Sequence, residues 1–257
     1  MIRDPNRIVD ELVADLRAAF GEHLLGVVLY GSAVSHEFRP GTSDVNIALV
    51  VDEAPVAVLG EGSAVLRNWM RRGIAVPLLF TPADLETAPV DYPVEFLDLQ
   101  HSYRVLSGDD PFSSVTVSRS RLRRQCRREL VGMALQLRRE FIRCGDSSAT
   151  RAEVIKTTVQ ALLPLFKAIV LLHDRKIPHS KTELIAAVED LFGLGASVIS
   201  EVYNRSNGMV AAERSAAEFD GVLRIVEKIA DYIGAMPEDR EFAVVSGAES
   251  PSVPIDR

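Results

Sequence analysis

The stretch YGSAVSHEFRPGTSDVNIALVVDE, residues 30–53, carries the strongest structural signal in the chain. It joins two apolar runs, residues 24–30 and 45–51, and the length and composition of both runs predict buried strands. Between them, Gly31 lets the backbone come close to a ligand, and Ser32 adds a hydroxyl and an N–H. A turn of this kind can hold phosphate oxygens.

Asp44 opens the second strand, twelve residues after Ser32. Side chains two residues apart share one face of a strand, so Asp44 and Asn46 point the same way while their neighbours face a core. Magnesium prefers oxygen ligands and takes one or two carboxylates beside the phosphates of a substrate. Asp44 is therefore a candidate metal ligand. Ser43, just before it, is expected to order the loop through a local hydrogen bond.

The chain before residue 113 alternates short apolar runs with helical patterns, which predicts a mixed sheet covered by helices. A helix is expected over residues 5–20, and a looser helical stretch leads up to Arg72. Thr81, followed by Pro82, predicts a capped helix start. The strands of this part are expected at residues 24–30, 45–51, 74–80, 93–99 and 103–106.

After residue 113 the strand-like alternation ends, and long helical stripes of apolar side chains begin. These stripes predict a helical bundle, with helices at about residues 118–145, 151–173, 181–192, 196–203 and 211–233. Residues 237–257 have too few apolar side chains in register to pack, so a flexible tail is expected there. The predicted organisation is an α+β fold with domains at residues 1–113 and 114–236.

Composition limits the classes of function. The 257 residues are 47% hydrophobic and carry a net charge of −7, which argues against general binding of nucleic acid because that binding needs cations to neutralise phosphates. No apolar run reaches the roughly 18 residues that cross a bilayer. The two cysteines lack the close spacing of a zinc site, and no disulfide is expected. A cytoplasmic protein without membrane or nucleic-acid partners is expected.

The order of these features resembles the nucleotidyltransferases of the DNA polymerase β-like superfamily. A strand, Gly-Ser, a connecting loop and Ser-Asp-Val-Asn on a second strand follow one another in GSAVSHEFRPGTSDVNIALVV. The pattern is similar to the small bacterial members, which include aminoglycoside nucleotidyltransferases. The resemblance implies a polymerase β-like module followed by a helical bundle. In that family, two acids of the second strand and a third from a later strand hold two divalent ions.

Carried over by position, the resemblance implies that Gly31 and Ser32 contact the triphosphate, with Ser43 beside them in the nucleotide site. Asp44 becomes the first metal ligand and a catalytic residue. The implied cofactor is Mg²⁺ or Mn²⁺, and the implied substrate is a nucleoside triphosphate. Its α-phosphorus would be attacked by the hydroxyl of an acceptor that the sequence does not identify.

The remaining acids of the family pattern are incomplete here. Asn46 stands where the second acid belongs, and it offers a carbonyl oxygen to a metal or nucleotide without a charge. The third acid, both metal ligand and catalytic residue, is placed at Glu95 in the expected strand 93–99, with Asp98 as the alternative. Two alternatives stay open: nucleotidyl transfer to a hydroxyl, or a catalytically impaired relative that binds a nucleotide or a protein partner.

Six arginines fall between residues 119 and 128, at the start of the helical part. They could take up a triphosphate, because guanidinium groups match phosphate oxygens, or they could form a solvated helix flank. The apolar helices could also leave a face for self-association, so a homo-oligomer stays open.

Overall fold

The computed structural model describes residues 2–35, 38–41, 43–195, 197–205, 212–237 and 243–244. These residues divide into two compact units, the first Met1–Val117 with Val244 and the second Ser118–Ala243. The tail predicted at residues 237–257 lies outside the described residues, except for Pro237 and for Ala243–Val244, the short strand β6 that pairs with β5, Val117–Ser118.

The first unit is built on a four-stranded sheet with the order β3-β2-β1-β4. β1 pairs antiparallel with both β2 and β4, whereas β2 pairs parallel with β3. The apolar runs that predicted β1 and β2 are buried here, as both faces of the sheet are covered. The strands are β1 (Leu24–Tyr30), β2 (Asn46–Val51), β3 (Leu78–Phe80) and β4 (Tyr103–Ser107).

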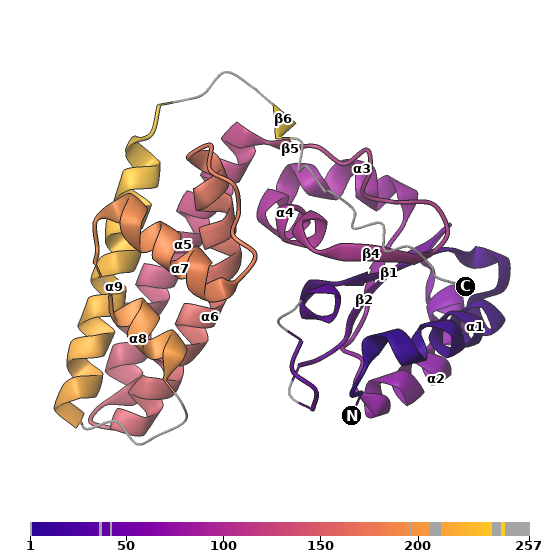
Figure 1. Ribbon diagram of the computed structural model, residues 1–257, viewed down its shortest axis with the longest axis horizontal. Helices are drawn as coiled ribbons and strands as arrows, with labels where there is room; N and C mark the ends of the chain where they lie inside the picture. Colours follow the sequence, from indigo (N-terminus) through magenta and orange to yellow (C-terminus); the bar gives the residue numbers. More distant parts are fainter. Residues whose placement is uncertain are drawn as a thin grey trace. The chain divides into compact units, whose positions relative to one another are not determined.

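Helices α1 (Val9–Phe20) and α2 (Val56–Arg72) cover one face of this sheet (Figure 1). The core between them is formed by alternate side chains of β1 and β2 together with apolar side chains of both helices, among them Leu12, Leu16, Phe20, Val27, Leu29, Ile47, Leu49 and Trp69. Trp69 has no exposed surface, and its indole N–H donates to Asp15 at 3.0 Å. Short 3₁₀ turns precede and follow α1, at Pro5–Ile8 and Gly21–His23.

Helices α3 (Pro82–Asp91) and α4 (Pro93–His101) cover the opposite face (Figure 1). The predicted cap at Thr81 is confirmed, since its side chain accepts from the Asp84 N–H and the Asp84 carboxylate accepts from the Thr81 N–H. Phe80 from the end of β3 packs against Phe96 of α4, with ring centroids 5.5 Å apart. This aromatic contact ties α4 to the sheet.

The strand predicted at residues 93–99 is wrong, because this segment is the helix α4. Its buried residues are Pro93, Val94, Phe96, Leu97, Leu99 and Gln100, a spacing that follows a helical face rather than strand alternation. Proline fits the first helical position, and Glu95 in the first turn interacts favourably with the helix dipole. The strand predicted at 74–80 is also shorter, beginning only after Pro77.

The second unit is a helical bundle around α6. Helix α6 contacts α5, α7, α8 and α9, and it is the one helix of the described residues that length and composition would let cross a membrane. Half of its most apolar window is buried within the protein (50%), as expected for a core helix. The helices are α5 (Arg119–Cys144), α6 (Ser148–Leu172), α7 (Lys181–Phe192), α8 (Val198–Asn204) and α9 (Ala212–Ala235). The starts predicted for the last two, Ala196 and Ala211, lie outside the described residues.

The first arginines of α5 bind the carboxyl ends of other helices. Arg119 donates to the carbonyl oxygens of Leu171 and Leu172 at the end of α6. Arg123 donates to the carbonyl oxygen of Met236 just beyond α9, at 3.0 Å. Guanidinium groups there satisfy carbonyls that a helix end leaves unpaired and oppose its negative dipole end. These two arginines therefore stabilise the bundle, which neither alternative from the sequence anticipated.

A surface ion pair in the first unit predicts a pH effect. His23 Nδ1 lies 2.9 Å from Asp52 Oδ1, and this hydrogen bond raises the pKa of His23 above 6.5 and lowers that of Asp52. The His23 contribution to stability is full below pH 6.5 and is lost as pH rises through the raised pKa. The Asp52 contribution is lost instead as pH falls through its lowered pKa. We expect an NMR titration of the His23 ring to give a pKa above 6.5 that Asp52→Asn returns to about 6.5. An unchanged pKa in the variant would contradict the pair.

Candidate active site

The candidate site begins at the turn after β1. The 3₁₀ turn η3, Gly31–Val34, starts as β1 ends, and the Gly31 N–H donates to the Ser102 carbonyl at 2.8 Å. Gly31 has a φ of 72°, which other residues rarely adopt, and a Cβ added there would lie 3.3 Å from Asn46 Nδ2. The backbone conformation therefore favours glycine, and a side chain at this position would also press against Asn46.

Asn46 lies beside this turn, at the start of β2, and Asp44 precedes it by two residues. Tyr30 pairs with Asn46 across the antiparallel ladder, which places the two side chains on the same face of the sheet. Asn46 is half-buried and turned toward Gly31, whereas Asp44, two residues earlier, is exposed. A neutral amide therefore lies against the turn, and the acid nearest to it in the sequence is the exposed Asp44.

The loop that leads into β2 is held by Ser43. Its hydroxyl oxygen accepts from the Arg39 N–H at 3.0 Å, and its own N–H donates to the Arg39 carbonyl at 2.9 Å. The local hydrogen bond predicted for Ser43 is confirmed. Ser32 is half-buried in the turn, and its carbonyl oxygen accepts from the Ser35 N–H at 3.1 Å.

The strand beside β2 supplies no acid. Val45 pairs in parallel with Ile74, and both side chains lie in the core beneath α1 and α2. Ala75 follows Ile74, and its N–H donates to the Val45 carbonyl at 3.0 Å; beyond this point the register shifts by one residue, because Ala48 pairs with Leu78. The run of residues 74–80, IAVPLLF, contains no acid that could serve as a third carboxylate.

Glu95 is exposed on α4, so the strand geometry that placed it in the site does not hold. Its role stays a prediction. Asp98, the alternative, shares a helical face with Glu95 because residues three apart on a helix are neighbours. Burial and then the nearby charge of Asp98 raise the pKa of Tyr30, so Asp98 lies on the Asn46 side of the sheet.

The residues present fit a pair of metal ions poorly. Two ions about 3.5–4 Å apart need several carboxylates to offset their repulsion, and of the two positions at the start of β2 only Asp44 is an acid. Among the residues that the structure describes, no group of three or more His, Cys, Asp or Glu side chains could hold a metal. One carboxylate does meet the lesser demand of a single magnesium ion whose other ligands are phosphates and water.

No family model matches this chain, and no curated protein matches its sequence. Among solved structures, a spectinomycin adenyltransferase from Enterococcus faecialis, determined with ATP and spectinomycin, is similar in fold. The TM-score is 0.56 at 10% sequence identity, over 87% of this chain and 100% of that chain. The chain therefore has a nucleotidyltransferase-like fold, and the predicted class, a mixed sheet module followed by helices, is confirmed.

Proposed function

We propose that this protein binds a magnesium-bound nucleoside triphosphate at the Gly31–Ser32 turn and that its capacity for nucleotidyl transfer is impaired. The observation that carries the proposal is the small number of acids around the start of β2. Asp44 and Asn46 flank Val45, and Ala75 donates its N–H to the Val45 carbonyl, but only Asp44 is an acid. The fold supports nucleotide binding, and the missing charges argue against efficient chemistry.

Binding of the triphosphate is favoured by the local backbone. Gly31 and Ser32 open a short 3₁₀ turn, where backbone N–H groups and the serine hydroxyl can donate to phosphate oxygens. The Asn46 amide lies against the same glycine and can donate to an anion, which an aspartate there could not do. Asp44 would hold the magnesium ion that arrives with the nucleotide.

Impairment follows from electrostatics. At an effective dielectric constant of about 20, a carboxylate about 4 Å from a monovalent charge contributes about 4 kcal/mol before screening. A factor of ten in rate corresponds to about 1.4 kcal/mol. Loss of two such carboxylates therefore lowers the stabilisation of a metal-bound transition state by several orders of magnitude. In this chain, Asn46 and Ala75 are those two losses.

Nucleotidyl transfer itself is the second candidate function. It would move a nucleoside monophosphate from the triphosphate to the hydroxyl of an unidentified acceptor and release pyrophosphate. Asp44, retained at the head of β2, favours it, as does the fold shared with an adenyltransferase solved with ATP. Release of labelled pyrophosphate from ATP, GTP, CTP or UTP with candidate hydroxyl acceptors separates this function from binding alone.

The proposed function predicts a magnesium-dependent rise in melting temperature with a nucleoside triphosphate. Asp44→Asn should weaken the apparent affinity, measured by calorimetry with magnesium and a non-hydrolysable ATP analogue, by about tenfold, because the metal loses its charged ligand. Glu53→Gln, an exposed acid just beyond the other end of β2, is the matched control and should bind like the natural chain. Equal weakening by both variants, or no binding of any triphosphate, would end the proposal.

A further inference from the structure

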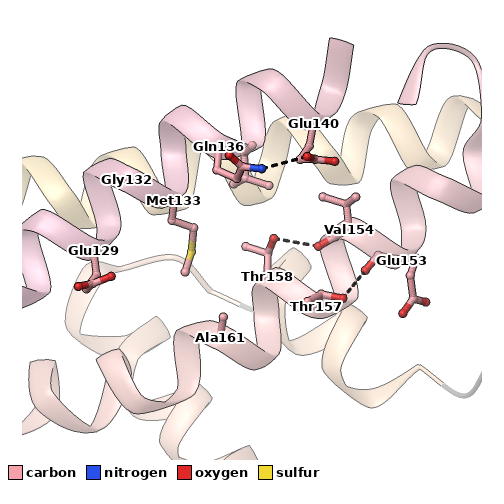
Figure 2. A pocket seen from close by; sticks show the side chains of 11 residues that line it. Glu129, Gly132, Met133, Gln136, Glu140, Glu153, Val154, Thr157, Thr158 and Ala161 are labelled. Carbon is pink, nitrogen blue, oxygen red and sulfur yellow. Dashed lines mark hydrogen bonds between the residues drawn. The ribbon is translucent and has the colours of Figure 1, made fainter. Parts of the chain in front are cut away.

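A groove runs between α5 and α6 within the helical unit. It encloses about 490 Å³, a volume typical of sites for small organic molecules. Figure 2 shows the side chains of both helices along its sides. The lining residues are Glu129, Gly132, Met133, Gln136, Leu137, Glu140, Glu153, Val154, Thr157, Thr158 and Ala161.

The middle of the groove offers a ligand mainly apolar surface. Met133 of α5 and Val154 and Ala161 of α6 lie along it in Figure 2, and Leu137 of α5 also lines it. The two threonines add no free hydroxyl donor, because Thr157 Oγ1 donates to the Glu153 carbonyl at 3.0 Å and Thr158 Oγ1 donates to the Val154 carbonyl at 2.8 Å. An occupant therefore meets mainly carbon along this part of the groove, and burial of its own apolar surface would favour binding.

The polar middle residue, Gln136, is also engaged. Its side-chain amide donates to Glu140 Oε1 at 2.9 Å, a contact drawn in Figure 2. The same carboxylate is bound by Arg143, and this hydrogen bond first of all lowers the pKa of Glu140. Glu140 is therefore ionised at neutral pH and held in place at the edge of the groove.

Carboxylates stand at both ends of the apolar middle. Glu129 lies at one end, and Glu140 with Glu153 lies at the other (Figure 2). Glu129 and Glu140 are eleven residues apart on one helix, about 16 Å along its axis. The lining contains three glutamates; Arg128 and Arg143, which do not line the groove, pair with Glu129 at 3.2 Å and with Glu140, and both of these ion pairs are at the protein surface. An occupant complementary to this arrangement carries positive charge at each end.

We propose that the α5–α6 groove binds an elongated organic dication, with an apolar chain between two ammonium groups. The chain lies over Met133 and Leu137, and each ammonium group meets a glutamate at one end. The volume of the groove and its charge at two separated points both suit such a molecule. All residues of this site belong to the helical unit, and none of them belongs to the proposed nucleotide site.

Binding is tested with 1,12-diaminododecane by calorimetry on the full chain. We expect a Kd of about 0.1–1 mM, in keeping with a flexible ligand of this size, and weaker binding at high salt. Two probes of similar length separate the contribution of charge to the affinity from that of the apolar chain. 1,12-Dodecanediol keeps the apolar chain without charge, and spermine keeps positive charge without a long apolar chain. Both should bind at least about fivefold more weakly, since exposed ion pairs contribute up to about 1 kcal/mol.

Gly132 allows the groove to be blocked without disturbing the core. A Cβ added at Gly132 meets no atom within 4 Å, so Gly132→Trp should fill the groove and weaken diamine binding by at least about tenfold. Gly132→Ala is the matched control and should bind normally. Glu129→Gln should weaken binding by about fivefold, whereas Glu86→Gln, an exposed acid in the other unit, should not.

Three results would overturn the proposal. Equal binding of the diol and the diamine would mean that the glutamates do not select charge. Full diamine binding by Gly132→Trp, with the variant folded by circular dichroism, would place the ligand elsewhere. Binding of a basic amphipathic helical peptide that Gly132→Trp abolishes, without diamine binding, would assign the groove to a protein helix instead.

Discussion

Asn46→Asp combined with Ala75→Glu is expected to tighten the binding of Mn²⁺, in the presence of a non-hydrolysable ATP analogue, by about a hundredfold. Asn46→Asp adds a carboxylate two residues from Asp44, and Ala75→Glu adds one in the segment that is hydrogen-bonded to Val45, which lies between residues 44 and 46. About 4 kcal/mol per unit-charge pair at about 4 Å, reduced by water and salt to roughly a third, leaves about a factor of ten for each carboxylate. Calorimetric titration of Mn²⁺ measures the effect.

The control for this double variant moves the second acid by one residue. Asn46→Asp with Val76→Glu carries the same added charge, but Val76 is 71% exposed and neighbouring residues of an extended chain point to opposite sides. This control should bind Mn²⁺ only about tenfold more tightly than the natural chain, because only the carboxylate at position 46 contributes. If both double variants bind Mn²⁺ equally, Ala75 is not the missing third position. If neither gains, the placement of Asn46 beside Asp44 is wrong.

A catalytic consequence follows from the same pair of substitutions. If three carboxylates restore a two-metal arrangement, the double variant should release measurable pyrophosphate from ATP in the presence of a hydroxyl acceptor. The natural chain should release none with the same acceptor. The double variant should also become more dependent on metal for stability, because like charges without a cation repel one another. A melting temperature that rises with added Mn²⁺ only in this variant would demonstrate that dependence.

The helices and strands that the sequence predicts most accurately are those marked both by their apolar pattern and by the residues that bound them. β1 and β2 were predicted by apolar runs bounded by turn chemistry, and α3 by the cap at Thr81. The segment 93–99 failed because a short apolar run suits a strand or a buried helix equally well. Pro93 at its start and Glu95 in the first turn were the signals that should have decided for a helix.

In the candidate site, the alternation of side chains along a strand allows a prediction only for residues of the same strand. Asp44 and Asn46 could be placed on one face from their spacing alone. The neighbour of Val45 could not, because the bridge from Val45 to Ile74 depends on the parallel pairing of β2 with the segment that leads into β3, which no local pattern encodes. The α5–α6 groove is likewise a product of tertiary packing, since its lining comes from two helices whose contacts the periodicity of each does not reveal.

The packing of α1 on α2 predicts the largest loss of stability. Gly62 of α2 lies against the ring of Phe20, the last residue of α1, and a Cβ added there would come 1.9 Å from Phe20 Cζ. Phe20 is only 1% exposed and has no open space on the protein surface into which to turn. Such overpacking costs up to about 3 kcal/mol, which exceeds the gain of about 1 kcal/mol from replacing a helical glycine by alanine.

Gly62→Ala should therefore lower the free energy of unfolding of the first unit by about 2 kcal/mol. Trp69, the only tryptophan, is fully buried in the same layer, so its fluorescence during urea denaturation reports on this unit alone. Gly60→Ala is the matched control, because a Cβ at Gly60 meets no atom within 4 Å and should raise stability by about 0.5–1 kcal/mol. The two alanines differ only in whether α1 stands in their way. Equal stability of the two variants would mean that Phe20 does not occupy the space above Gly62, and the assignment of α1 and α2 to one layer would fail with it.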